Sequence, residues 1–364
     1  MSKLGSLQQG YTFDDVVLVP QSSSVKSRED PSLETTVASL KYTTPIISSP
    51  MNTVTEDKML VTMGRLGGIG VLHRYMSVDS QLEIATEAYG ELLNYVSDPM
   101  VHIYVAIGVN DLGRVKVLGQ HGFNNYCVDV ANGHNDNCAM AVKEIKSLNP
   151  DARVMAGNVC TYKGALELAK AGASSIRVGI GSGSVCVTRQ ITGHGMPQLT
   201  AIDECVKIKH SGEWKGSTRV NIGKFSHVSI IADGGIRHAG DIVKSLAMGA
   251  DAVMIGGLLA ASSETPGEII EESGQLYKYY NGMASDAGRA GWFDRSKTGP
   301  AEGVSIKTPY AGKSAHKIIQ NLAASVKVGL SYSGASNLVE LRNKAELIGV
   351  TSAGWIEGTP HGKK

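Results

Sequence analysis

The segment VSIIADGGIRHAGDIVKSLAMGADAVMIGGLL, residues 228–259, shows the pattern that decides the fold. Two apolar runs rich in β-branched residues, 228–235 and 252–259, flank a stretch in which apolar residues recur at helical spacing. Continuous apolar strands separated by helices indicate a parallel sheet that is covered on both faces. The segment is therefore expected to form a strand, a helix and a second, parallel strand.

The same alternation extends over most of the chain. Six further apolar runs precede this segment, at residues 45–49, 67–73, 101–108, 124–130, 152–159 and 175–181. Eight strand and helix units favour a closed (β/α)₈ barrel over an open sheet. We therefore expect an α/β protein whose residues 1–364 form a single (β/α)₈ TIM barrel domain.

Some parts of the chain depart from this spacing. Two long intervals, around residues 77–100 and 206–227, predict loop-bearing insertions. Residues 281–312 show little periodicity, and an aperiodic loop of that length in a compact domain is usually a lid or flap. We expect a mobile active-site flap there, and a frayed tail over residues 352–364.

Composition excludes several classes of protein. Hydrophobic residues make up 42% of the chain and charged residues 19%, which excludes wholesale disorder. The 35 Lys and Arg against 34 Asp and Glu leave no strong field for binding nucleic acid or an anionic membrane. No stretch approaches the ~18 apolar residues of a membrane span, and the amino terminus lacks the apolar core of a signal peptide. We expect a cytoplasmic protein with small-molecule partners, no nucleic acid and no membrane.

The cysteines do not suggest a disulfide framework or a zinc site. No CxxC pair is present, and no histidine pair has zinc-ligand spacing. One cysteine stands apart, because the sixth run continues into the glycine-rich GIGSGSVCVTR at 179–189. Barrel active sites lie at the carboxyl ends of strands, and a cysteine there can act as a nucleophile. The commoner fate is a small buried hydrophobe, which is our expectation for Cys127, Cys138, Cys160 and Cys205.

Other polar residues end neighbouring runs. The seventh and eighth runs end in DGG at 233–235 and GG at 256–257, in the loops where barrels often bind phosphate. These glycines could equally make tight turns only. The carboxylate of Asp233 suits a sugar hydroxyl. Asp129 and Asn158 end the fourth and fifth runs, where each could contribute to the site or merely cap a helix. Histidines in such loops are more often solvated, which is the expectation for His73, His134 and His194.

Six motifs in order resemble the IMP dehydrogenase and GMP reductase family over nearly the whole chain. They are SPMNTVTE at 49–56, GGIGVLHRYMS at 67–77, GIGSGSVCVTRQITGHGMPQ at 179–198, ADGGI at 232–236, MIGG at 254–257 and GMAS at 282–285. The resemblance implies the same barrel, usually as a homotetramer. It also implies that Cys186 attacks C2 of a purine nucleotide to form a thioimidate, with Thr188 and Glu302 as the proton-transfer pair.

The resemblance also suggests binding residues. The phosphate, ribose and base of the nucleotide would contact Ser184, Asp233, Gly235, Gly256, Gly257, Gly282, Met283, Ala284 and Ser285. The cofactor would contact Asp129 and Asn158. A monovalent cation, expected to be K⁺, would be bound by the backbone carbonyls of Gly181, Gly183 and Cys186.

Two reactions are possible with this machinery. IMP dehydrogenase transfers hydride from IMP to NAD and hydrolyses the thioimidate to XMP, whereas GMP reductase expels ammonia from GMP and uses NADPH to give IMP. CVDVANGH at 127–134 resembles the reductase. The interval between Ser77 and Val101 is too short to hold a tandem regulatory domain, which also resembles the reductase. The flap resembles the reductase as well, because it lacks the Arg-Tyr pair of dehydrogenases. SPMNTVTE and LRNKAELIGV at 341–350 resemble dehydrogenases instead.

We therefore expect GMP reduction with NADPH, with NAD-dependent IMP oxidation as the alternative. A nucleotide-binding protein without catalysis is a third possibility, and the retention of Cys186, Thr188 and Glu302 argues against it. The chain also departs from the family pattern, with Ser182 in place of the usual loop proline and Asn52 in place of an aspartate.

Overall fold

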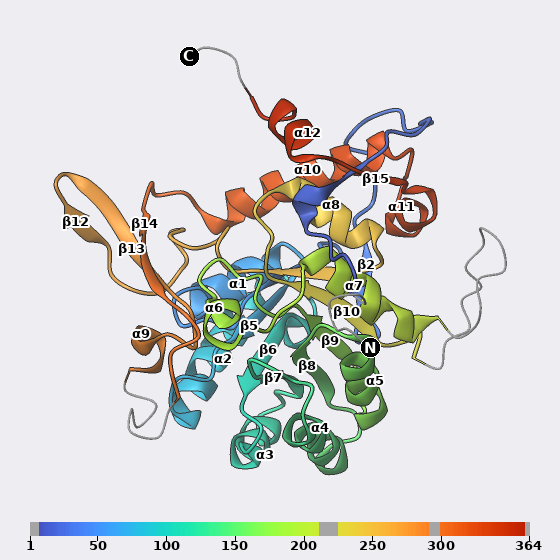
Figure 1. Cartoon of the computed structure of the whole chain (residues 1–364). Coiled ribbons are helices and arrows are strands. Elements are labelled where there is room, and N and C mark those ends of the chain that lie inside the picture. The colour runs from blue at the N-terminus through green and yellow to red at the C-terminus, as the bar shows by residue number, and fades with distance from the viewer. Residues whose placement is uncertain (1–6, 211–224, 291–298, 361–364) are drawn as a thin grey trace.

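Eight parallel strands form a closed barrel, with helices packed around it (Figure 1). The computed structural model describes residues 7–210, 225–290 and 299–360. The barrel order is β10-β11-β4-β5-β6-β7-β8-β9, and the ring closes where Val253 of β11 pairs with Ile46 of β4. The predicted (β/α)₈ barrel is confirmed, and the open sheet is excluded.

Each barrel strand lies within one of the eight apolar runs. The strands are β4 Ile46–Ser48, β5 Ile69–Leu72, β6 Ile103–Ile107, β7 Asn125–Asp129, β8 Arg153–Val159, β9 Ser175–Val178, β10 Ser229–Asp233 and β11 Ala252–Ile255. The larger helices are α1 Asp57–Arg65, α2 Val78–Leu92, α3 Leu112–Gln120, α4 Asp136–Leu148, α5 Tyr162–Ala171, α7 Gln198–Val206, α8 Ala239–Ala247 and α10 Ala315–Tyr332.

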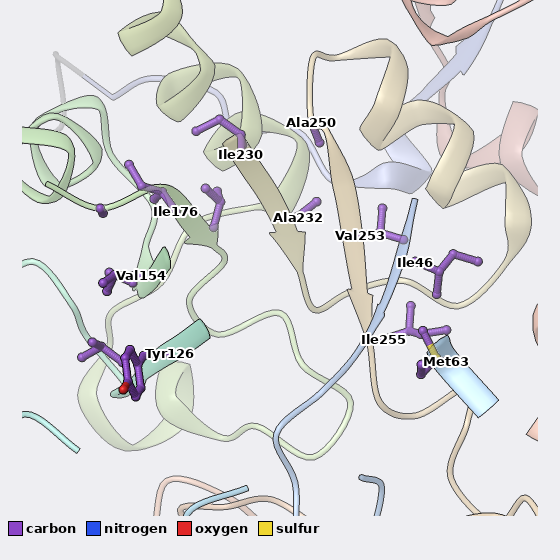
Figure 2. Close-up of a cluster of buried hydrophobic side chains, with 14 of the residues drawn as sticks. Ile46, Met63, Tyr126, Val154, Ile176, Ile230, Ala232, Ala250, Val253 and Ile255 are labelled. Carbon is purple, nitrogen blue, oxygen red and sulfur yellow. The ribbon is translucent and has the colours of Figure 1, made fainter. Parts of the chain in front are cut away.

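Burial on both faces explains why the strand runs are apolar without alternation. Successive strand residues point to opposite faces of a sheet. Ile46 and Ile230 belong to the cluster between the strands and the helices, part of which is drawn in Figure 2. The next residues, Ile47 and Ile231, belong to a second buried cluster on the opposite face of the strands, inside the barrel. Water is therefore excluded from both faces of the strands.

The insertion expected around residues 77–100 is wrong. Ser77 accepts a hydrogen bond from the Ser80 backbone N–H at 3.0 Å and caps α2, which connects β5 to β6. A short 3₁₀ helix, η3 Pro99–His102, completes the connection. The interval is long because its barrel helix is long. Of the second expected insertion, residues 206–210 end α7 and form η4 Lys207–Lys209, while residues 211–224 lie outside the described residues.

A three-stranded antiparallel sheet, whose third strand lies within the expected flap, projects from the barrel (Figure 1). It consists of β12 Ile270–Glu272, β13 Gln275–Asn281 and β14 Ser305–Pro309. The expectation that residues 281–312 lack regular structure is therefore wrong for β14, whose formation depends on pairing with a distant strand rather than on local periodicity. The short helix α9 Asp286–Arg289 also falls in this stretch. Residues 291–298 of the expected flap lie outside the described residues.

The two ends of the described chain are tied to each other. β1 Val16–Leu18 near the amino terminus pairs with β15 Leu347–Gly349 near the carboxyl terminus. A separate two-stranded sheet is formed by β2 Thr35–Val37 and β3 Leu40–Tyr42. The remaining helices are η2 Phe13–Asp15, α6 Thr188–Thr192, α11 Leu338–Lys344 and α12 Ser352–Glu357. The expected frayed tail is wrong for α12, which Thr351 caps. None of the helices in the described ranges is long and apolar enough to cross a membrane.

We expect Glu264→Gln to destabilise the protein at neutral pH. The Glu264 carboxylate accepts hydrogen bonds from Ser314 Oγ at 2.6 Å and from the Ala315 N–H at 2.7 Å, at the start of α10. Burial alone would raise the pKa of Glu264, but these hydrogen bonds outweigh it and lower the pKa. Loss of such a cap costs about 0.5–2 kcal/mol.

The pH dependence of that loss provides a check. A lowered pKa stabilises the fold above the pKa of the unfolded carboxyl, roughly 4.3, and the contribution disappears as the pH falls through the folded pKa. The difference between Glu264→Gln and wild type in urea unfolding should therefore shrink below about pH 4. Glu268→Gln, at an exposed position nearby, is the control. A difference that stays constant with pH would show that the charge of Glu264 is not involved.

Candidate active site

A cavity of about 790 Å³ lies at the carboxyl ends of the barrel strands. Its lining comes from residues at or just after the ends of β4, β5, β7, β8, β9, β10 and β11. These segments are distant in the sequence, and barrel closure brings them together. The cavity lies where the sequence analysis expects the active site.

Cys186 begins a hydrogen-bonded chain on the wall of this cavity. Its Sγ donates to Thr188 Oγ1 at 3.2 Å, and Thr188 Oγ1 donates to Glu302 Oε2 at 2.9 Å. Thr188 and Glu302 are 114 positions apart, and backbone bonds hold their segments together: the Val187 N–H donates to the Glu302 carbonyl at 2.9 Å. A thiol, a hydroxyl and a carboxylate in sequence can move a proton between the reacting atom and Glu302.

The other four cysteines have a different environment. Burial raises the pKa of the Cys127 thiol to about 12 and that of Cys138 to about 11. Burial also raises the pKa of Cys160 and Cys205. These thiols are therefore protonated at neutral pH and poor nucleophiles. Cys127, Cys138 and Cys205 are buried, as expected, whereas Cys160 is only partly buried.

Three hydrogen-bond donors orient the carboxylate of Asp233. Asn158 Nδ2 donates to Asp233 Oδ2 at 2.8 Å, and it also donates to the Gly179 carbonyl at 2.9 Å. Arg177 donates to the same Oδ2 through Nη2 at 2.8 Å and Nε at 3.2 Å. Arg177 Nη1 donates to Asp129 Oδ1 at 2.8 Å. Asp129, Asn158 and Asp233 thus form one network, and the structure places the side chain of Asn158 mainly in that network.

Arg177 is a site residue that the sequence analysis missed. It is 5% exposed within the apolar strand β9. A charged residue inside a buried strand is rare unless it is paired, so the run SIRVGIG contained a usable signal.

The predicted phosphate-side residues form a close-packed cradle. A Cβ atom added to Gly257 would lie 2.9 Å from Ser184 Oγ, and one added to Gly256 would lie 2.9 Å from Tyr280 Oη. Ser184 Oγ and Tyr280 Oη are 3.4 Å apart. Burial raises the pKa of Tyr280 to about 12, so its hydroxyl is a hydrogen-bond donor at neutral pH. The left-handed Gly235, with φ of +77°, lines the same cavity.

Tyr280 was also missed in the sequence. It lies in YKYYN, residues 277–281, which contains three tyrosines, and residue type alone does not show which of them faces the site. Strand alternation distinguishes them, because Tyr280 is buried whereas Tyr279 is exposed.

The GMAS residues divide between two roles. Gly282, Met283 and Ala284 line the cavity. Ser285 is buried and caps α9, where its Oγ accepts a hydrogen bond from the Gly288 N–H at 2.9 Å. The structure therefore gives Ser285 a local structural role. The residues expected to bind a cation, Gly181, Gly183 and Cys186, lie together on the cavity wall.

The expectation that His73 is solvated is wrong. His73 is 2% exposed, its Nε2 lies 3.1 Å from Glu56 Oε1, and its Nδ1 accepts from the Tyr75 N–H at 3.2 Å. His134, beside Glu167, and His194 are both exposed, in keeping with the expectation.

Comparison with known proteins identifies the family of this chain. The family model described as the IMP dehydrogenase / GMP reductase domain matches residues 10–361. Inosine-5'-monophosphate dehydrogenase of Cryptosporidium parvum is 36% identical, over 98% of this chain and 96% of its own length. Proteins with the same name from Methanocaldococcus jannaschii and Nitrosopumilus maritimus are 30% and 29% identical, over 99% and 97% of this chain and 97% and 98% of their own lengths. The chain therefore belongs to the IMP dehydrogenase and GMP reductase family of oxidoreductases.

Proposed function

We propose that this protein oxidises IMP to XMP with NAD, through a thioimidate on Cys186. The observation that supports the chemistry is the hydrogen-bonded chain from Cys186 through Thr188 to Glu302 on the cavity wall. The choice of IMP oxidation over GMP reduction is supported by the relatives described above, which are named as dehydrogenases. Several motifs in the sequence suggest the reductase instead.

Cys186, Thr188 and Glu302 each have a defined task in this reaction. The Cys186 thiol adds to C2 of IMP, and the proton it releases passes through Thr188 to Glu302. The bound NAD, which Arg74 and Asp129 would help to hold, would supply the acceptor for the hydride that leaves C2. Glu302 first releases the proton from Cys186 to solvent, and water then attacks the thioimidate at C2 while its proton passes through Thr188 to Glu302. When the C–S bond breaks, Glu302 returns this proton through Thr188 to the sulfur, which gives XMP and the free thiol. Glu302 must therefore accept a proton twice in each turnover and release it twice, once to solvent and once to the sulfur.

The described residues fit a nicotinamide cofactor next to the nucleotide. Arg74 lines the cavity, and none of the described residues hydrogen-bonds its buried Nε. Asp129 Oδ2 lies 3.8 Å from that atom. A buried cationic donor and a carboxylate facing one cavity suit the phosphates and ribose hydroxyls of a dinucleotide.

GMP reduction with NADPH is the second candidate. The residues from Gly282 to Glu302 contain no Arg-Tyr pair, so Thr188 and Glu302 are the groups that remain for proton transfer. The same pair can protonate departing ammonia, which a reductase requires.

An assay of the purified protein tests the choice. We expect IMP and NAD to give XMP with stoichiometric NADH, and GMP with NADPH to react more slowly. Chromatography of the nucleotides identifies the product, and Cys186→Ala protein controls for contaminating activity. Faster NADPH consumption with GMP would reverse the assignment to the reductase.

The proposal extends to the assembly and the ion. On the family resemblance, the active form is a homotetramer with K⁺ bound by the carbonyls of Gly181, Gly183 and Cys186. The left-handed φ of +79° at Gly181 supports a loop that turns its backbone groups toward an ion. Light scattering at assay concentration and rates in K⁺ against Li⁺ check both statements.

A further inference from the structure

Arg177 joins carboxylates from two sides of the active-site cavity. Its guanidinium bonds to Asp233 at the end of β10 through Nη2 and Nε, and to Asp129 at the end of β7 through Nη1. These two strands are not adjacent in the barrel, since β8 and β9 lie between them. One side chain from β9 therefore spans the distance between two anionic groups.

We propose that Arg177 is a positioning residue that aims Asp233 at the ribose of the nucleotide and couples that site to the cofactor side through Asp129. The inference rests on the proposed function, because it takes Asp233 as the ribose carboxylate. Arg177 acts through the two aspartates and need not touch either ligand itself.

The arrangement around Asp233 restricts how its carboxylate can turn. The Arg177 and Asn158 bonds all converge on Oδ2, so the plane of the carboxylate is set and Oδ1 is the oxygen that remains for a ligand. The Asp233 side chain is 14% exposed and the residue lines the cavity. A ribose hydroxyl can therefore donate to a carboxylate that is already oriented, which reduces the entropy lost on binding.

The negative charges of Asp129 and Asp233 also need a positive charge between them, which Arg177 provides. Two partly buried carboxylates facing one cavity repel each other and are poorly solvated. Burial opposes the charge on Arg177, but neighbouring Cys127 and the carboxylates of Asp233 and Asp129 outweigh it and raise its pKa well above the usual value. The guanidinium is therefore always charged, and it places that charge 2.8 Å from a carboxylate oxygen of each aspartate.

A lysine cannot replace this function. Its ammonium is a single point at the end of a flexible chain, whereas the guanidinium holds donors for both carboxylates in one plane. Arg177→Lys keeps the charge and loses the simultaneous contact. Arg153→Lys is the matched control: Arg153 is also a barrel-strand arginine, but it begins β8 and contacts Asn125 rather than the cavity.

The test measures nucleotide binding without turnover. Cys186→Ala protein is titrated calorimetrically with IMP and with 2′,3′-dideoxy-IMP, which lacks both ribose hydroxyls, with and without NAD. A hydrogen bond to a charged acceptor predicts a preference for IMP on the order of 10- to 100-fold. Adding Arg177→Lys should reduce that preference to within about threefold and remove the effect of NAD on IMP affinity. Adding Arg153→Lys should change neither quantity.

The outcomes separate this proposal from the proposed function. An unchanged ribose preference in the Arg177→Lys protein would overturn the positioning role, even if the wild-type enzyme oxidises IMP. If the wild type neither oxidises IMP nor reduces GMP, the proposed function fails, while the ribose preference still reports on Arg177. If Arg177→Lys does not fold, Asp129→Asn replaces it: the proposal then requires a retained ribose preference with lost coupling to NAD, and retained coupling would overturn it.

Discussion

Cys186→Ala is expected to abolish turnover and to leave nucleotide binding measurable. The expected loss exceeds about 10⁴-fold, because removal of a covalent nucleophile eliminates the reaction path rather than weakening one contact. On the proposed function, nucleotide affinity is expected to depend instead on Asp233 and on the cradle of Ser184, Gly257 and Tyr280, which the substitution leaves in place. Initial rates and calorimetry with IMP measure the two effects separately.

The matched control for this variant is Cys160→Ala. Cys160 is also partly buried, but it follows β8 rather than lying on the glycine-rich loop. Its replacement should change the rate by less than about threefold, which is within the range of small surface effects. Near-normal activity of Cys186→Ala would show that no thioimidate forms on this residue. Mass spectrometry of the quenched wild-type reaction should find the adduct on the peptide containing Cys186.

Glu302→Gln should slow the reaction by roughly 10²- to 10⁴-fold while nucleotide binding persists. Glutamine has nearly the same shape and can still accept the hydrogen bond that Thr188 Oγ1 donates at 2.9 Å. It cannot take up a proton, so the chain from Cys186 no longer ends in a base. The effect should therefore appear in kcat rather than in the affinity for IMP.

Two changes at Thr188 test whether the hydroxyl relays the proton. Thr188→Ser keeps an Oγ and should remain near the wild-type rate, whereas Thr188→Val removes it and should resemble Glu302→Gln. Residues that act as one unit give non-additive losses, so the double variant Thr188→Val/Glu302→Gln should be little slower than either single variant. Full activity of Glu302→Gln, or additive losses, would exclude the relay.

Local patterns in the sequence predict most of the fold. The eight strands are identified because both faces of each are buried, which makes runs such as Ala252–Ile255 apolar without alternation. The places where the prediction is wrong are those where local pattern carries little information. The interval at 77–100 is long because α2 has 15 residues, and β14 forms because β13 offers it a partner.

The sequence by itself also singles out Cys186 and, through the family motifs, Thr188 and Glu302. A cysteine in a glycine-rich loop at a strand end is recognisable without the structure, because its setting is made by adjacent residues. The hydrogen bond between Thr188 and Glu302 cannot be recognised from the sequence, since it depends on backbone pairing between the loop after β9 and the segment before β14.

Arg177 and Tyr280 show what only the tertiary structure decided. In the sequence, Arg177 is one residue of an apolar strand and Tyr280 is one of several tyrosines. Closure of the barrel places the ends of β7, β8 and β10 around Arg177, and the projecting sheet places Tyr280 against Ser184. Apolar periodicity determines elements because burial acts on neighbouring residues. Hydrogen bonds and ion pairs require atoms within about 3 Å, and for residues far apart in the chain only the closed fold brings them to that distance.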